Sequence, residues 1–249
     1  MPSLLLLLAL ATAAHPAVRP GAALALQPDT LRPGSTALSP SQLRPYTIAR
    51  RLELTRGDST RPFGRQSEQL VLDSLDGRAA VLHVLVFDTP FAVTVDSSWV
   101  DPATLAPRRM VSRNKNRTLV LEFGAGKVRT TITPADGATT VKEAVLPTDT
   151  FEWNMLPVAL AALDLHEGDR LVLPSFSDRA DRVTWYTVDV SADSLTRPSG
   201  RVAPMWRLRA TPAGEAPSAE WWVSRRHHVL DQARVAEPGV AMLYARADL

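Results

Sequence analysis

The chain has 249 residues, 45% hydrophobic and 22% charged, an ordinary globular composition and a length sufficient for one large domain with its own core. A formal net charge of +2 over this length lacks the concentrated positive charge of a nucleic-acid-binding protein, so we expect no nucleic-acid partner. The absence of cysteine excludes disulfides, thiolate metal sites and a lipid-modified N-terminal cysteine.

The N-terminal part reads as an export signal followed by a spacer. Residues 4–14 form an apolar run too short to span a bilayer, and small residues in an Ala-x-Ala cleavage pattern follow it. We therefore expect residues 1–25 to be a signal peptide and the mature protein to be periplasmic or secreted, without a transmembrane segment; the alternative is a mis-assigned start. Residues 26–45 are rich in proline, which predicts a disordered spacer.

From there on, short strands alternate with turns. The pairs Asp76-Gly77 and Asp136-Gly137 are strong hairpin signals. Turns recur about every 8–12 residues, which is typical of an antiparallel sheet closed or half-closed into a barrel. The expected strands cover residues 46–55, 69–74, 79–88, 91–100, 110–113, 118–123, 127–133, 138–146, 170–176, 182–190, 205–210, 220–224, 228–236 and 240–245.

One segment predicts a helix, over residues 155–165. It is apolar all round until Asp164, so it must be buried on more than one side. Gly168 is the expected C-terminal stop. The expected fold is therefore one mainly β domain over residues 46–249, an antiparallel half-barrel or open barrel of about a dozen strands with one buried helix against its concave face.

The start of this helix can be placed in two ways. Asp149 and Glu152 have capping-box spacing, but a start there would bring Pro157 into the helix interior. An N-cap at Asn154 leaves Pro157 in the first turn, where its missing N–H is not needed. The second placement is favoured.

Histidines are the first candidates for chemistry. His227 and His228 are adjacent at the start of an expected strand, and neighbours on a strand point to opposite faces and cannot easily share a metal ion. His83 stands alone on its strand. A Gly-x-Ser-x-Gly elbow is absent from the sequence, and no spacing of acidic residues singles out a catalytic pair. We expect no catalytic residue, no metal and no cofactor.

A basic segment lies in the middle of the chain. It could form a patch for an anion or a lipid headgroup, but cations commonly guard exposed strand edges, and we favour a solvated hairpin. Its charged residues are Arg108, Arg109, Arg113, Lys115 and Arg117.

Tryptophan is unusually frequent, with six Trp against three Tyr, and Trp221 and Trp222 are adjacent on an expected strand. One of the two must face inward and the other outward. An exposed tryptophan often marks a contact surface.

Four stretches of the sequence carry a resemblance to a known family. They are residues 46–54, 99–112 with the turn Asp101-Pro102, 163–173 with a Leu-x-x-Gly-Asp element, and 220–230 with Trp222 followed by Arg225-Arg226. Together they resemble a bacterial family of exported β-proteins of unknown function, whose fold is similar to that of the periplasmic lipoprotein carriers LolA and LolB. The resemblance implies a half-barrel whose concave face is covered by helix, and it brings no catalytic residues. The lipid binding of the carriers enters only as an analogy of fold.

The sequence thus leads us to expect a non-enzymatic envelope protein that binds a lipid or another apolar ligand between sheet and helix. The alternatives are a partner-binding module of the cell envelope that uses a sheet edge or the Trp221/Trp222 surface and, less favoured, a hydrolase. The expected ligand-binding residues are Leu119, Leu121, Phe123, Trp153, Leu156, Leu160, Trp185 and Trp222.

Overall fold

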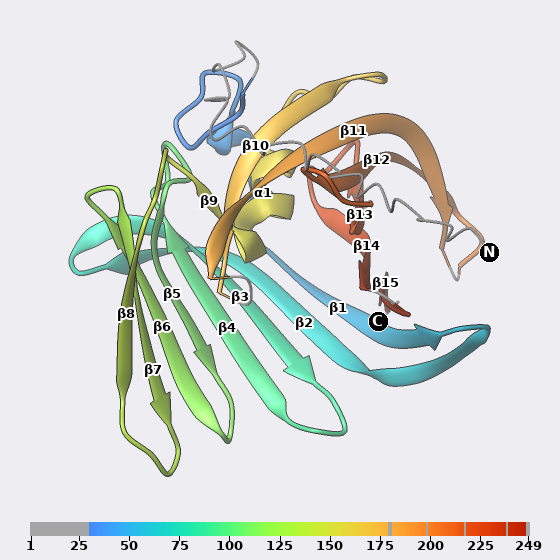
Figure 1. Ribbon diagram of the computed structural model, residues 1–249. Coiled ribbons are helices and arrows are strands. Elements are labelled where there is room, and N and C mark those ends of the chain that lie inside the picture. The colour runs from blue at the N-terminus through green and yellow to red at the C-terminus, as the bar shows by residue number, and fades with distance from the viewer. Residues whose placement is uncertain (1–29, 179–180, 198, 217, 238, 248–249) are drawn as a thin grey trace, which may run out of the picture.

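The structure, a computed structural model, describes residues 30–178, 181–197, 199–216, 218–237 and 239–247. These residues form one 15-stranded sheet that curls around a single short helix (Figure 1). This confirms the predicted mainly β, open half-barrel, with more strands than expected. The strands are β1 (Tyr46–Arg56), β2 (Ser59–Leu75), β3 (Arg78–Asp88), β4 (Val93–Val100), β5 (Pro107–Arg113), β6 (Arg117–Gly124), β7 (Lys127–Pro134), β8 (Thr140–Val145), β9 (Phe151–Glu152), β10 (Arg170–Ser177), β11 (Arg182–Thr196), β12 (Val202–Pro212), β13 (Ala219–Ser224), β14 (Leu230–Glu237) and β15 (Val240–Arg246).

The sheet consists of two arms that meet at its centre. The first arm runs outward from β1 to β8, and the second runs outward from β15 to β9. All neighbouring strands are antiparallel except β9 and β10. The arms join where β1 pairs with β15, from Arg50 opposite Arg246 to Thr55 opposite Ala241. The strands β8 and β9 are consecutive in the chain yet form the two opposite edges.

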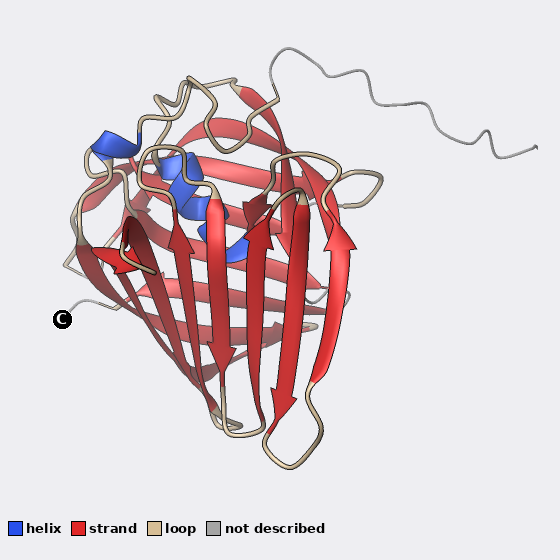
Figure 2. Cartoon of the chain, turned by 90° about the vertical axis from the view of Figure 1, so that its left-hand side faces the viewer, coloured by secondary structure: helices blue, strands red, loops and turns tan. Residues whose placement is uncertain are grey.

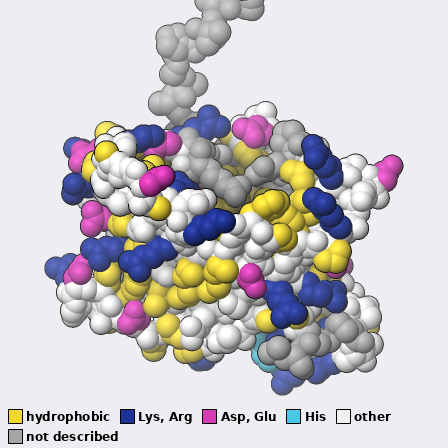
Figure 3. Space-filling view, turned by 90° about the horizontal axis from the view of Figure 1, so that it is seen from below, with side chains coloured by type: hydrophobic (Ala, Val, Ile, Leu, Met, Phe, Trp, Pro, Cys, Tyr) yellow, Lys and Arg dark blue, Asp and Glu magenta, His cyan; other side chains and the backbone are white. Residues whose placement is uncertain are grey.

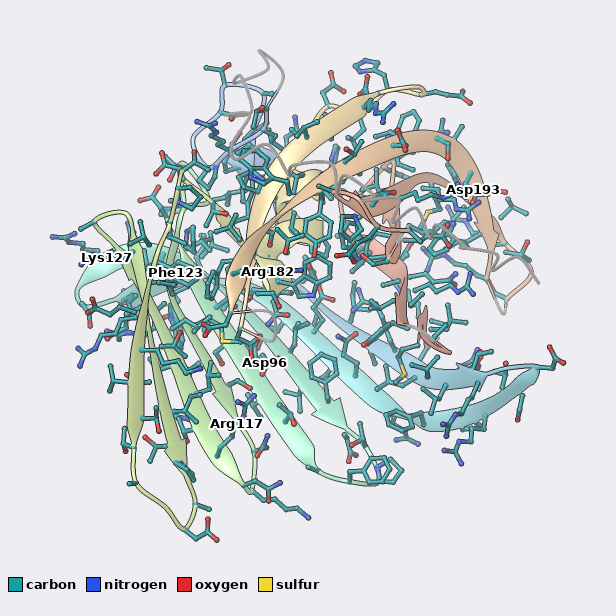
Figure 4. The ribbon with its side chains drawn as sticks, viewed as in Figure 1. Asp96, Arg117, Phe123, Lys127, Arg182 and Asp193 are labelled. Carbon is teal, nitrogen blue, oxygen red and sulfur yellow. The ribbon has the colours of Figure 1, made fainter. Side chains whose placement is uncertain are left out.

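The second arm folds back over the first. Leu173 and Tyr186 of the β10–β11 hairpin face the main core, which is the larger cluster of buried side chains and includes most of residues 155–163. Phe176 lies on the opposite face of β10 and packs with inward side chains of β5, β6 and β7. The hairpin is thus covered on both faces. Figure 4 labels Phe123 and Arg182, which lie where the two arms come together. The strands of the first arm form the wall seen in Figure 2, with the helices behind them.

The helical segment sits inside this curl. A 3-10 turn, η2 (Trp153–Met155), leads into the helix α1 (Leu156–Ala161), whose first turn contains Pro157, where no N–H is needed. All its residues except the half-buried Pro157 are buried, because the sheet surrounds them, as the apolar sequence predicts. The concave face therefore holds a packed core rather than a large empty space.

The predicted N-cap and the predicted C-terminal end of the helix are wrong, whereas its start lies within one residue of the expected position. The first turn is capped by Glu152, whose side chain accepts a hydrogen bond from the Asn154 N–H, so Asn154 lies inside the turn. The helix stops at Ala161, well before Gly168, because the Ser39 N–H donates to the carbonyl of Ala162 (2.8 Å) and the chain turns away from helical geometry there. Tertiary pairing therefore ends the helix.

The expected disordered spacer is corrected over residues 30–45. Leu31 and Leu38 are buried in the main core, Leu38 bridges to Leu163, and a 3-10 turn, η1 (Pro40–Gln42), follows. The apolar side chains among the prolines supply the burial that orders this segment. The predicted signal peptide, residues 1–25, lies outside the described residues.

Candidate functional site

A pocket lies on the concave face, between the sheet and the start of the helical segment; we call it the concave pocket. Its volume is about 90 Å³. That is roughly three times the volume that one water molecule occupies in liquid water. It is well below the roughly 300 Å³ at which small-molecule sites begin. Its lining residues are Gln66, Glu68, His83, Leu85, Phe87, Trp153, Asn154, Pro157, Trp221, Leu230, Ala233, Val235 and Tyr244.

Aromatic side chains form the roof and the mouth of the concave pocket. Trp153 packs against Trp221 with ring centroids 5.9 Å apart and against Tyr186 at 5.2 Å. Phe87 and Tyr244 meet edge to face at 6.4 Å. Such pairs are rigid and hold the walls in place. Apart from the floor and Asn154, the lining is consequently apolar.

The floor is a buried ionic network centred on Arg50. This side chain is 1% exposed and points inward from β1. It donates to the Gln66 side chain (3.0 Å), to the Glu68 carboxylate and to the backbone carbonyl of Leu230. The network ties β1 and β2 to β14. A buried arginine satisfied in this way fixes the relative position of the strands that it bridges.

Glu68 is held as an anion. Burial alone would raise the pKa of this carboxyl, but the Arg50 guanidinium together with hydrogen bonds from His83 and Tyr46 outweighs burial and lowers the pKa to about 2. The Tyr46 hydroxyl donates to Oε1 of Glu68 at 2.5 Å. Burial and the Glu68 charge raise the pKa of Tyr46 in turn, so the hydroxyl stays protonated.

His83 completes the floor and keeps one nitrogen unused. The side chain is 3% exposed, and its Nε2 lies 3.1 Å from Oε1 of Glu68. Its Nδ1 is buried without a hydrogen-bond partner among the described residues. Burying a polar atom in this way costs roughly 1–3 kcal/mol. Because Nδ1 has almost no accessible area, it is also closed off from the open volume of the pocket.

A second buried carboxyl lies at the base of η2. Glu152 is 3% exposed and accepts hydrogen bonds from the Asn154 N–H (2.9 Å) and the Ser98 hydroxyl (2.8 Å). Burial raises its pKa to about 7, against these hydrogen bonds and with help from the charges of Asp96 and Asp178. The cap of the helical segment is therefore a carboxyl that titrates near neutrality.

The predicted ligand-binding residues fall in different places. Trp153 lines the concave pocket. Leu156 and Leu160 are fully buried in the main core and do not reach the pocket. The inward-facing side chains of β6 pack against Phe176 and not against α1; they are Leu119, Leu121 and Phe123.

The two other predicted tryptophans lie away from the concave pocket. Trp185 is on the opposite face of β11 from Tyr186, so the expectation that it faces the helix is wrong. Trp222 is 8% exposed, donates to Asp193 (2.8 Å) and is covered by Arg207 at 5.5 Å. In Figure 4, Asp193 lies towards one end of β11 and Arg182 lies at the other end. With Trp221 at 3% exposed, neither adjacent tryptophan offers a contact surface.

The residues of the polar floor of the concave pocket were not among the predicted site residues, although the sequence holds a signal for them. The hairpin at Asp76-Gly77 fixes the register of β2 against β3, which pairs Leu70 with His83. Glu68 is two residues along from Leu70 and so faces the same side, one step diagonally from His83. A charged residue at an inward position of an apolar strand was the indication.

Three of the five charged residues of the basic segment are engaged in ion pairs. Arg108 donates to Asp101 (2.6 Å), Arg109 lies 3.4 Å from Glu122, and Arg117 lies 3.8 Å from Asp178. Among the described residues, no group of three or more His, Asp or Glu side chains is placed to hold a metal ion. In the same part of the chain, no helix is both long and apolar enough to cross a membrane.

Apolar side chains also reach the outer surface. Figure 3 shows a band of hydrophobic side chains across the face seen from below, with Lys and Arg beside it. Converging polar groups of the kind found on the pocket floor are not seen in this band, so it is a weaker candidate site. The large apolar side chains that are most exposed among the described residues are Leu72, Phe91, Val93, Val141, Val145 and Val202.

Comparison with known proteins gives a family without an assigned function. A family model described as "Protein of unknown function (DUF3108)" matches residues 61–243. None of the curated proteins matches the chain. The chain is similar to a DUF1329 family protein of Desulfovibrio piger, known from a crystal structure, with 11% identity, coverage of 84% of this chain and 86% of that chain, and a TM-score of 0.28. A similarity this weak carries no argument about function.

Proposed function

This chain belongs to the DUF3108 family of proteins of unknown function, and we propose that it is a non-enzymatic binding protein of the cell envelope that takes an apolar group into the concave pocket. The observation that carries the proposal is the lining of the pocket, with aromatic walls above one buried polar floor. Apolar sites with a few converging polar groups are the usual form of a ligand site. The export signal expected over residues 1–25 supports the location.

The ligand is defined by size and by polarity. A volume of about 90 Å³ admits one small ring or the end of a chain, and a longer ligand leaves through the mouth beside Phe87 and Tyr244. The ligand end carries a hydrogen-bonding group, because polar side chains such as Gln66 and Asn154 lie among the apolar lining residues. A lipid fits only with its tip inside.

Filling the mouth of the pocket tests this function. Val235 is half-buried and lines the pocket. The larger side chain of Val235→Phe should therefore fill much of the pocket volume without preventing the protein from folding. We expect an organic extract of the natively purified protein to contain a stoichiometric apolar molecule in mass spectrometry. We also expect the emptied protein to bind a fluorescent dye with an alkyl tail, whose tip can enter the pocket while its rings stay outside, at least about tenfold more tightly than the variant does.

The matched control is Val202→Phe, which makes the same change at a side chain that is 60% exposed and outside the pocket lining. It should keep both the extracted molecule and the affinity for the dye. A blank extract together with equal dye binding by all three proteins would show that the pocket is merely part of the core.

A second function is favoured by the free edge at β8. This strand pairs only with β7 among the described strands, and its Val141 and Val145 are 47% and 74% exposed. An open apolar edge can accept an extended segment of a partner as a further strand. The partner would be another envelope protein.

Charges on the edge test the second function. The double substitution Val141→Lys and Val145→Lys should abolish strand addition, because lysine on an edge opposes pairing. The measurement is cross-linking of the intact protein in envelope extracts, followed by mass spectrometry of the linked segments. Leu72→Lys, at a side chain that is 75% exposed elsewhere, is the control. Links to β8 that persist in the double variant would refute edge recognition.

A further inference from the structure

A larger cavity lies at the end of the β1–β15 junction, and none of its lining residues belongs to the concave pocket. It holds about 640 Å³, which is in the range of small-molecule sites. Three parts of the chain converge on it: the segment around η1 and the start of β1, the turn between β13 and β14, and the end of β15, near the label C in Figure 1. We call it the arginine cavity.

Its lining carries an excess of positive charge. The charged side chains of the lining, apart from the histidines, are Arg44, Arg226, Arg246 and one carboxylate, Asp231. That carboxylate is 2% exposed and already accepts hydrogen bonds from Arg246 and from Arg197, the latter at 2.6 Å. Asp231 is thus occupied by structural ion pairs and does not neutralise the other arginines.

Two of the arginines have no acidic partner. Arg226 is exposed and makes no hydrogen bond or ion pair with the described residues, and Arg44 donates only to the backbone carbonyl of Ser41 (2.7 Å). The neighbouring Arg225 shows what a structural role looks like in the same turn. It stacks 3.8 Å above Trp206 and donates to the Met205 carbonyl (3.0 Å).

The turn that presents Arg226 is held firmly. The Ser224 N–H donates to the Val229 carbonyl (2.9 Å), and the His228 N–H donates to the Ser224 carbonyl (3.0 Å). His228 has a φ of 51°, in the left-handed region that few residues with side chains adopt. Its ring Nδ1 lies 3.0 Å from the Ala161 carbonyl at the end of α1, which ties the turn to the helix. The backbone that carries Arg226 is therefore fixed before any ligand enters.

We propose that the arginine cavity binds an anion with a carboxylate or phosphate group, held by Arg226 and Arg44 with Arg246 and His228 beside it. The planar guanidinium matches the paired oxygens of these groups. The anion is either a small molecule in solution or the headgroup of a lipid. The site is separate from the concave pocket, and the buried Arg50–Glu68 network stands between them.

The test titrates the full mature protein with inorganic phosphate and with acetate by calorimetry, with chloride keeping the ionic strength constant. A parallel arm measures co-sedimentation with vesicles of phosphatidylglycerol, using phosphatidylcholine vesicles as the reference. Arg226→Gln and Arg44→Gln remove charges on exposed side chains, so both variants should fold. Each should weaken binding about tenfold or more. The matched control is Arg61→Gln, at an exposed arginine of β2 outside the cavity.

Binding of phosphate or acetate that depends on Arg226 and Arg44 but not on Arg61 supports a small soluble anion. Binding limited to phosphatidylglycerol vesicles, with the same dependence, supports a lipid headgroup at the same site. The proposal is overturned if none of the probes binds, or if Arg61→Gln weakens binding as much as the two cavity variants do.

Discussion

Replacing Glu68 with glutamine should destabilise the protein by about 3–5 kcal/mol, because the buried Arg50 would lose the carboxylate that balances its charge. This is a large part of the roughly 5–15 kcal/mol by which a typical domain is stable. Urea unfolding at pH 7 measures the change as a lower midpoint. The double substitution Arg50→Met and Glu68→Leu should recover much of the loss, since neither charge then remains buried.

An exposed ion pair on the same strand provides the comparison. Arg51 and Glu53 lie 3.9 Å apart, with the arginine side chain 59% exposed. Glu53→Gln should change stability by less than about 1 kcal/mol. A similarly small change for Glu68→Gln, or a double variant no more stable than the single one, would show that the buried network contributes little.

The second large effect is a dependence of stability on pH that comes from Glu152. Burial raises its pKa from 4.5 to about 7, so the folded protein favours the protonated carboxyl. The stabilisation is complete below pH 4.5 and is lost as the pH rises towards 7, by about 3 kcal/mol in all. Glu152→Gln should remove this loss, because the amide oxygen can accept from the Asn154 N–H while the amide NH2 donates to the Ser98 hydroxyl oxygen.

Urea unfolding at several pH values between 5 and 8 measures the effect. The charged groups that face Glu152 are Asp96 and Asp178, with Arg117 beside Asp178. The pKa of Asp96 is also raised by burial, so a small slope should remain in the variant. Glu167→Gln, at an exposed site, should keep the full slope of the unchanged protein. An equal slope in Glu152→Gln would place the titrating group elsewhere.

The half-barrel could be predicted because its signals are local. Alternation in residues such as Leu119 and Leu121 and turns such as Asp76-Gly77 depend on neighbours in sequence, and both appear as expected. The partner of the β6 side chains could not be predicted, because Phe176 reaches them only after the second arm folds back. The end of the helix was missed for the same reason: it depends on Ser39, more than a hundred positions away.

Part of the candidate site could be predicted from the sequence. Trp153 was expected in the site, and it lines the concave pocket. The floor around Glu68 and His83 was not among the predicted residues. The Asp76-Gly77 hairpin nevertheless sets the register between β2 and β3 that brings these two side chains together. The arginine cavity has no comparable local signal, because Arg44, Arg226 and Arg246 come from three distant segments.

The central junction of the sheet also governs how the chain folds. In the pairing of β1 with β15, Arg50 lies opposite Arg246, which is 196 positions away in the sequence. Every other pair of neighbouring strands in the sheet is consecutive in the chain. Each arm can therefore form early from local hairpins, and the joining of β1 to β15 comes late, since closing so long a loop is slow. Until the last strand is in place, the edge of β1 lies open to other chains, and aggregation competes with folding during that interval.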